Sequence, residues 1–136
     1  MKKTPEQISK EWLFFAGSDL RLAKLALRDK IYHETCFLSH QSAEKSLKAI
    51  LARKESVIPK THSLNFLNKL VFQGFGKENL PPEQAQFLDQ FYLPARYPDA
   101  FPGSLPEGLP QKKDAEKALK FAGNFFYLAT KLIQVK

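Results

Sequence analysis

The chain has 136 residues, with 21 Lys and Arg against 14 Asp and Glu, which gives a formal net charge of +7. Its length suits one domain with a real core, so we expect residues 1–136 to form a single domain. The positive charge favours contact with phosphates or an acidic partner, although a solvated lysine-rich surface would have the same composition. One cysteine, Cys36, excludes an intrachain disulfide. The charged N-terminus and the lack of a long apolar run favour a cytoplasmic protein with no membrane contact.

Apolar residues at steps of three and four predict two long helices in the first half of the chain. The first extends from about Pro5 to Arg28, with Pro5 in its first turn. The second extends from about Tyr32 to Lys54, and Pro59 follows it. The residues expected to face inward are Ile8, Trp12, Phe15, Ala16, Leu20, Ala23 and Leu27 on the first helix, and Cys36, Ala43, Leu47, Ile50 and Leu51 on the second.

Three further helices are predicted in the second half. Thr61 or Ser63 can cap a short helix that carries Leu64, Leu67, Leu70 and Val71 and ends at Gly74-Phe75-Gly76. A fourth starts at Pro81-Pro82-Glu83 and buries Phe87, Leu88 and Phe91. The fifth, from about Asp114 to Val135, has the clearest apolar stripe and should pack along the whole bundle. The chain should therefore be an all-α bundle of about five helices. We expect Tyr32, Phe37, Phe66, Phe72 and Phe75 to be core residues.

Prolines at every fourth position, from Pro94 to Pro110, exclude a regular helix between the fourth and fifth helices. The aromatic residues Tyr92, Tyr97 and Phe101 indicate that the first half of this loop is pinned to the body. We expect Gly103 to Lys113 to be a mobile surface segment. Loops of this length inside a compact domain are usually functional or disordered.

Polar residues lie where the helical spacing predicts burial. On the first helix, Asp19 falls beside the apolar stripe, and on the second, His40, Gln41, Glu44 and Lys48 share adjacent turns with Lys45 at the border. Because an unpaired buried carboxylate is costly, Asp19 should pair with Lys48 or Lys45. Two interpretations remain open. The cluster can be a buried network that fixes helix register, or it can be a cationic, amide-lined site for a nucleotide or RNA phosphate.

Other patterns are weaker. His33 and His40 can share a helix face, but without a third ligand we expect no metal site. His62 can be a helix cap or a ligand-facing base. Cys36 has no partner that suggests catalysis. The sequence holds no glycine loop for phosphates, no paired-cysteine motif and no serine elbow, and no cofactor is expected.

Several spaced motifs occur together over nearly the whole chain. They are Asp19-Leu20 with Ala23, Tyr32 with Cys36-Phe37, His40-Gln41-x-x-Glu44-Lys45-x-x-Lys48-Ala49, Pro59-Lys60-Thr61-His62 with Leu64 and Leu67, and Arg96-Tyr97-Pro98-Asp99. In this combination they resemble the HEPN domain. The resemblance implies an all-α, up-and-down helical bundle, often dimeric, from a prokaryotic class found beside small nucleotidyltransferases in toxin–antitoxin pairs. Many relatives are metal-independent endoribonucleases that use an R-x4-6-H motif near the last helices.

This chain departs from that nuclease motif. No histidine follows Arg96, and the one formal match, Arg28 to His33, lies between the first two helices. The resemblance therefore implies a nucleotide- or RNA-phosphate-binding protein that acts with a small nucleotidyltransferase and forms a homodimer. In this hypothesis Arg96 and Lys45 or Lys48 contact phosphate, while His40 and His62 donate hydrogen bonds. Asp99 orients Arg96, and Asp19 and Glu44 orient the basic groups.

Two alternatives belong to other functional classes. In the first, the chain is a metal-independent endoribonuclease toxin in which Arg96 stabilises the transition state and His62 or His40 is the base. In the second, it is a non-catalytic dimerisation or adaptor module, and all these polar residues serve the scaffold.

Overall fold

A computed structural model describes residues 2–55, 57–75, 80–92, 101, 103–105 and 107–134, and this part of the chain contains five α-helices. The helices are α1 (Pro5–Arg28), α2 (Tyr32–Arg53), α3 (Leu64–Phe75), α4 (Pro82–Asp89) and α5 (Lys112–Gln134). Among the described residues there is no β-strand, only an isolated bridge between Leu105 and Gly108. The prediction of an all-α helical bundle is confirmed.

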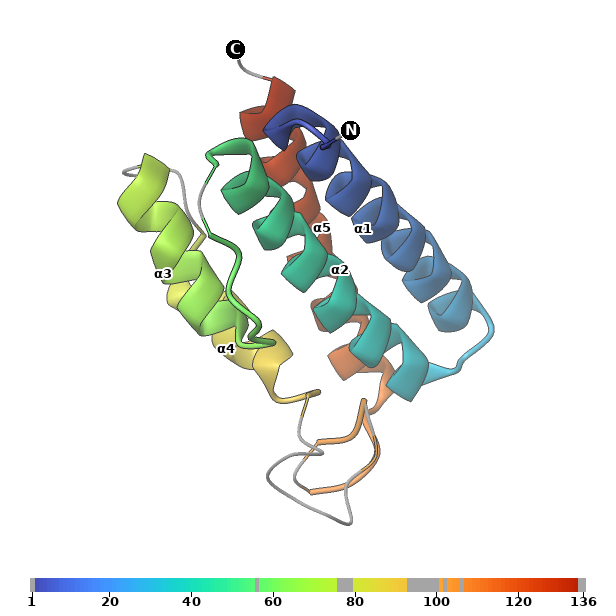
Figure 1. Ribbon diagram of the computed structural model, residues 1–136. Coiled ribbons are helices and arrows are strands. Elements are labelled where there is room, and N and C mark those ends of the chain that lie inside the picture. Colours follow the sequence, from blue (N-terminus) through green and yellow to red (C-terminus); the bar gives the residue numbers. More distant parts are fainter. Residues whose placement is uncertain are drawn as a thin grey trace.

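The first helix begins where its capping signals lie. The Thr4 side chain accepts a hydrogen bond from the Gln7 backbone, the Gln7 side chain accepts one from the Thr4 backbone, and Pro5 opens the helix. At the other end, Lys30 adopts a left-handed φ of 63°. Only residues 29–31 separate α1 from α2, so the two helices pack as antiparallel neighbours (Figure 1).

The second helix is the centre of the bundle and contacts each of the other four. Small residues allow α1 to approach it closely: the Ser42 hydroxyl donates to the Ala16 carbonyl at 2.7 Å, and the Thr35 hydroxyl donates to the Ala23 carbonyl at 3.2 Å. On its other sides α2 packs against α5 and α3. The largest fully buried apolar side chains are Phe91, Phe125, Leu47, Ile50, Leu64, Leu67, Leu88 and Val71.

The third and fourth helices form a second layer beside α2. After α2 ends, the chain returns along this helix before α3 begins, so the start of α3 lies beside the middle of α2 (Figure 1). The Ser63 hydroxyl accepts a hydrogen bond from the Phe66 backbone and caps α3, as one of the two predicted candidates. This return of the chain brings the residues after Pro59 to the polar cluster of α2.

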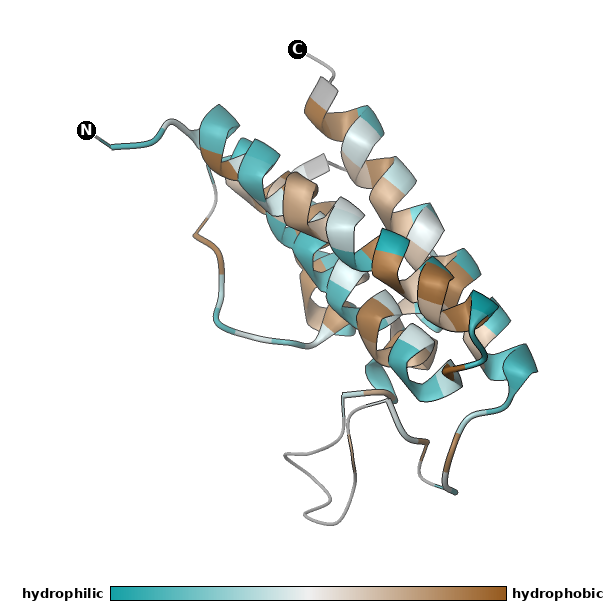
Figure 2. Cartoon of the chain, turned by 90° about the vertical axis from the view of Figure 1, so that its right-hand side faces the viewer, coloured by the Kyte–Doolittle hydropathy of each residue, from teal (hydrophilic) through white to brown (hydrophobic). Residues whose placement is uncertain are grey.

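Three expectations about individual residues are wrong. Phe15 is 54% exposed, because α1 carries apolar residues on its outer face as well as its inner one; Phe14, Leu22 and Leu25 are also exposed there. Figure 2, which views the bundle from this side, shows apolar and polar residues interspersed along the helices that face the viewer. Phe66 and Phe72 are exposed on α3, not in the core, while Tyr32 and Phe37 are half-buried.

The loop before α5 also differs from expectation. Gly103, Ser104 and Leu105 are buried, so this part of the predicted surface segment packs against the body, whereas Phe101 is 76% exposed. Among the helices that the structure describes, none is long and apolar enough to cross a membrane.

Candidate functional site

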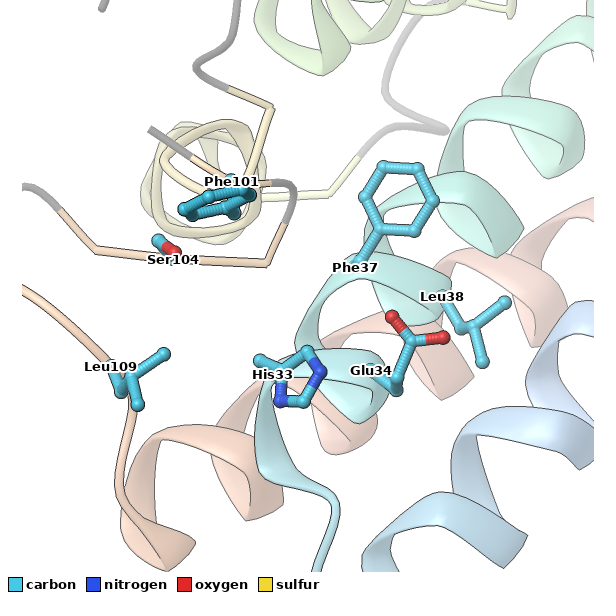
Figure 3. Close-up of a pocket in the computed structure, with 7 residues that line it drawn as sticks. All are labelled: His33, Glu34, Phe37, Leu38, Phe101, Ser104 and Leu109. Carbon is cyan, nitrogen blue, oxygen red and sulfur yellow. The ribbon is translucent and has the colours of Figure 1, made fainter. Parts of the chain in front are cut away.

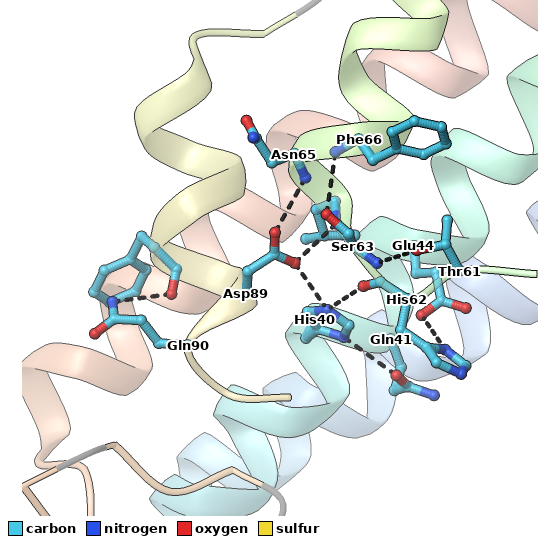
Figure 4. Close-up of polar contacts among 12 residues, drawn as sticks. His40, Gln41, Glu44, Thr61, His62, Ser63, Asn65, Phe66, Asp89 and Gln90 are labelled. Carbon is cyan, nitrogen blue, oxygen red and sulfur yellow. Dashed lines mark hydrogen bonds and ion pairs between the residues drawn. The ribbon is translucent and has the colours of Figure 1, made fainter. Parts of the chain in front are cut away.

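Glu44 is the centre of the polar cluster on α2 (Figure 4). One of its carboxylate oxygens accepts a hydrogen bond from Lys48 Nζ at 2.9 Å, and the other accepts one from His62 Nδ1 at 3.0 Å. The Glu44 and Lys48 side chains are only 7% and 8% exposed, but His62 is 50% exposed. Because a carboxylate only accepts, Glu44 places the His62 proton on Nδ1 and leaves Nε2 for a ligand.

His40 is fully buried beside this pair and ties three helices together. Its Nε2 lies 3.0 Å from the His62 carbonyl oxygen and 3.2 Å from Asp89 Oδ1, and its Nδ1 lies 3.2 Å from Gln41 Oε1. Both neighbours of Nε2 only accept, so this nitrogen carries a proton and donates it.

Asp89, the last residue of α4, does more than accept from His40. Its two oxygens also accept from the backbone amides of Leu64 and Asn65 at 2.8 and 3.1 Å, as Figure 4 shows. A carboxylate at a helix N-terminus satisfies orphan amides and opposes the positive end of the helix dipole. Asp89 therefore caps α3 from another helix while it holds the buried His40.

An aromatic ring covers both histidines. Tyr92 stacks on His62 with ring centroids 4.4 Å apart and an interplanar angle of 24°, and on His40 at 5.3 Å and 25°. This ring comes from the turn after α4. The exposed His62 ring is thus held on one edge by Glu44 and on one face by Tyr92.

The remaining charged residues of the predicted site that the structure describes are paired. Lys45 Nζ lies 2.7 Å from Asp19 Oδ2, which decides between the two partners expected for Asp19. Lys48 pairs with Glu44 and lies over the Trp12 ring at 5.6 Å from its centroid. Both lysines that were predicted to meet phosphate therefore already have a carboxylate neighbour.

The structure describes most of the site residues singled out from the sequence. His40, Glu44, Lys48 and His62 form one connected group, and Lys45 pairs with Asp19 on the neighbouring α1. Arg96 and Asp99 lie outside the described residues. Sequence analysis missed Asp89 and Tyr92, which are linked to the histidines only through contacts between residues far apart in the chain.

The geometry of the described residues gives little support to a metal site or to a cysteine nucleophile. Within the described ranges, no three His, Cys, Asp or Glu side chains gather where they could hold a metal ion. Cys36 is buried, and this burial, together with the nearby charge of Asp114, raises its pKa from 9.0 to about 12. The thiol therefore stays protonated and is a poor nucleophile near neutral pH.

The fold and the site define the class of protein: a helical bundle with a buried histidine–carboxylate network between its two layers. Comparisons with known proteins then identify the family. The HEPN domain model matches residues 9–132, and the chain belongs to the HEPN family.

Individual relatives match over most of their length. A Methanocaldococcus jannaschii protein named "Putative toxin MJ1304" is 30% identical over an alignment of 119 residues, which covers 80% of this chain and 77% of that protein. The crystal structure of TT1696 from Thermus thermophilus matches with a TM-score of 0.73 at 28% identity, over 91% of this chain and 97% of that one. ST0689, described as an archaeal HEPN homologue, matches with a TM-score of 0.71 at 28% identity, over 98% and 100% of the two chains.

Proposed function

We propose that this HEPN protein binds the phosphate of a nucleotide or RNA where α2, the start of α3 and the turn after α4 meet. The observation that carries the proposal is the half-exposed His62, which Glu44 and Tyr92 hold in one orientation; a His62 ring with a proton on Nε2 as well as on Nδ1 donates from Nε2 to a phosphate oxygen. Arg96 follows Tyr92 by four residues in the sequence, and four residues of chain reach at most about 14 Å. A guanidinium close to this imidazole would supply the fixed charge for a phosphate.

The ion pairs of Lys45 and Lys48 change the roles that we expected for these two residues. Lys48 is buried with Glu44, so we assign it to orienting His62 through that carboxylate. Lys45 is 27% exposed at its side chain, and its partner Asp19 is 14% exposed, so a phosphate can compete for Lys45 more easily. His40 is fully buried and serves the site by fixing the loop that carries His62. Asp99 remains the proposed orienting group for Arg96.

Ligand binding is tested by thermal unfolding with millimolar ATP, GTP and inorganic tripolyphosphate. Because a ligand that binds only the folded state raises its stability, each should raise the melting temperature, and less so in 200 mM than in 50 mM salt. Arg96→Ala should remove this rise without changing the melting temperature of the free protein, whereas the exposed Arg21→Ala on α1 should keep it. A rise that is the same in Arg96→Ala would exclude Arg96 as the phosphate contact, whereas no rise in the wild-type protein would favour the adaptor alternative.

The same geometry supports an endoribonuclease as a second candidate. A carboxylate bonded to Nδ1 of an exposed histidine is the arrangement by which proteins orient a general base, and His62 has this arrangement with Glu44. In that case the protein should cut single-stranded RNA in EDTA, and His62→Gln should abolish cleavage. Intact RNA under conditions in which a relative with the R-x4-6-H motif cuts it would exclude this candidate.

We also propose that the protein is the toxin-like member of a toxin–antitoxin pair and acts with a small nucleotidyltransferase. Support comes from its HEPN family membership and from the relative that is named as a toxin. Co-purification from the native host, with the partner identified by mass spectrometry, tests this. Recovery of the protein without any nucleotidyltransferase would count against the pair.

A homodimer is supported by the outer face of α1. Phe14, Phe15, Leu22 and Leu25 are between 45% and 67% exposed there, which is unusual for large apolar side chains on one helix. Light scattering should give the mass of two chains, and Leu22→Glu should give the mass of one. A monomeric wild-type protein would contradict the proposal.

A further inference from the structure

A hollow of about 530 Å³ lies at the first turns of α2, beside the polar cluster but separate from it. One side consists of His33, Glu34, Phe37 and Leu38 from α2, and the other of Phe101, Ser104 and Leu109 from the loop before α5. Figure 3 shows the loop residues on one side and the α2 residues on the other, with His33 and Phe37 nearest to the loop. The volume is within the range of about 300–1,000 Å³ that is typical of small-molecule sites.

The loop side of this hollow is a well-supported wall. The Gly103 amide donates to the Phe91 carbonyl at 3.1 Å, and Leu105 and Gly108 exchange backbone hydrogen bonds at 2.8 and 3.0 Å. Gly103 has a φ of +89°, and a Cβ at this position would collide with the carbonyl oxygen of His33. Glycine therefore lets the loop press directly on the first turn of α2, which fixes the width of the hollow.

The lining of the hollow fits a flat ring with apolar faces and a polar edge. Phe101 and Leu109 are each 76% exposed and Phe37 is half-buried, so these side chains offer apolar surface that the chain itself leaves uncovered. A nucleobase has such faces and stacks on aromatic side chains without regard to its identity. The carboxylate of Glu34, also on the lining, is the group that can distinguish one base from another.

A carboxylate only accepts hydrogen bonds, so it recognises a base by its donors. Guanine presents two adjacent donors on one edge, the N1–H and the 2-amino group, which match the two oxygens of Glu34. Adenine and cytosine present a single amino group, and uracil presents a single ring N–H between two acceptors. The bidentate match therefore favours guanine.

The hollow also lies at a suitable distance from the proposed phosphate site. Phe37 and Glu44 are seven residues apart on α2, so a helical rise of 1.5 Å per residue separates them by about 10 Å along the axis. A ribose can bridge a base in the hollow and a phosphate beside His62. We propose that the hollow is the base subsite of a guanine nucleotide or guanosine residue of RNA and that Glu34 selects the base; this rests on the phosphate site proposed above.

Calorimetric titration with GMP, IMP and AMP tests the selection, because these ligands share ribose and phosphate and differ only in the base. IMP lacks the 2-amino group, and AMP lacks both the 2-amino group and the N1–H. GMP should bind about tenfold more tightly than either, which is the loss expected for a hydrogen bond to a charged group. Glu34→Gln should reduce the preference to less than twofold, while the exposed Glu116→Gln on α5 should preserve it.

A second variant, Phe101→Ala, tests whether this ring stacks on the base regardless of which base is bound. Its ring is exposed, so the melting temperature of the free protein should not change, but the affinity for all three nucleotides should fall by a similar factor. Equal affinity for the three nucleotides in the wild-type protein, undetectable binding of all three at 5 mM, or an undiminished GMP preference in Glu34→Gln would each overturn the inference.

The two proposals can fail separately in this experiment. Tripolyphosphate binding that depends on Arg96, with no preference among the three nucleotides, would leave the phosphate site standing and overturn the base subsite. A GMP preference that depends on Glu34, together with a GMP affinity that is unchanged in Arg96→Ala, would support the base subsite and overturn the phosphate assignment.

Discussion

The two halves of α2 differ in what surrounds their side chains. The half from His40 to Lys48 is closed in by the rest of the bundle, and the half from His33 to Leu38 borders an open hollow. Between His40 and Lys48 the buried charged and imidazole groups each meet a partner inside the bundle: Glu44 with Lys48 and His62, and His40 with Asp89. Between His33 and Leu38 apolar groups line an open hollow, opposite a loop whose Phe101 is exposed. One helix can therefore hold the bundle together through paired buried groups in its closed half and offer an uncovered surface to a ligand in its open half.

The largest loss of stability is expected when one charge of the buried Glu44–Lys48 pair is removed from the closed half. Glu44→Gln keeps the size of the side chain but leaves the ammonium of Lys48 buried without a carboxylate. We expect the free energy of unfolding to fall by about 3 kcal/mol, measured by urea denaturation. The double variant Glu44→Gln/Lys48→Met should recover much of this loss. A single variant as stable as the wild type would show that the pair is not a structural element.

The next largest effect should come from Asp89→Ala. This change removes one of the two acceptors of His40 Nε2 and the acceptor of two amides at the start of α3, and we expect a loss of about 2 kcal/mol. Asp29→Ala, at an exposed carboxylate after α1, is the matched control and should cost less than about 0.5 kcal/mol. Equal losses in the two variants would contradict the role of Asp89 as a cap supplied by another helix.

Cys36 lies on the buried side of the open half of α2 and tests how well the packing there excludes water. Its pKa is raised to about 12 from 9.0, so the unfolded chain loses the thiol proton at a lower pH than the folded protein. Stability from this group is therefore complete below pH 9 and lost as the pH rises toward 12. Between pH 8.5 and 10.5 the wild type should lose about 1–2 kcal/mol more than Cys36→Ala, measured by denaturation at both pH values. Parallel losses would contradict the shift.

The smallest effect is expected at the border of the cluster. Lys45 and Asp19 are partly exposed, so Lys45→Met should cost less than about 1 kcal/mol. A double-mutant cycle with Asp19→Asn isolates the pair energy. The same Lys45→Met variant should weaken tripolyphosphate binding if the lysine exchanges its carboxylate for phosphate. A stability loss as large as that of Glu44→Gln would show that this pair belongs to the closed half.

Much of the fold could be predicted from the sequence because its signals are local. The bounds of α1, Pro5 and Arg28, follow from Pro5 and the apolar period, and α2 ends at Arg53, one residue before the predicted Lys54. The predicted inward residues of α2 are all buried. The outward position of Phe15 could not be predicted in this way, because an apolar residue beside the inner stripe has the same spacing whether or not a neighbouring helix covers it.

The candidate site could be predicted only in part. The helical period placed His40, Glu44 and Lys48 on adjacent turns, and the cost of a buried charge required partners for them. It could not decide whether Asp19 meets Lys45 or Lys48, because both lysines lie within reach of one carboxylate. Asp89 gave no signal, since its partners are 24, 25 and 49 residues away along the chain.

The sequence by itself determined the helices, their inner faces, the resemblance to the HEPN family and the need for paired charges, because each depends on the spacing of neighbouring residues. Only the tertiary structure decided which charges pair, that Asp89 caps α3, and that the loop pressed on α2 at Gly103 encloses a hollow. Such contacts join residues that are distant along the chain, and their geometry exists only after the helices have packed.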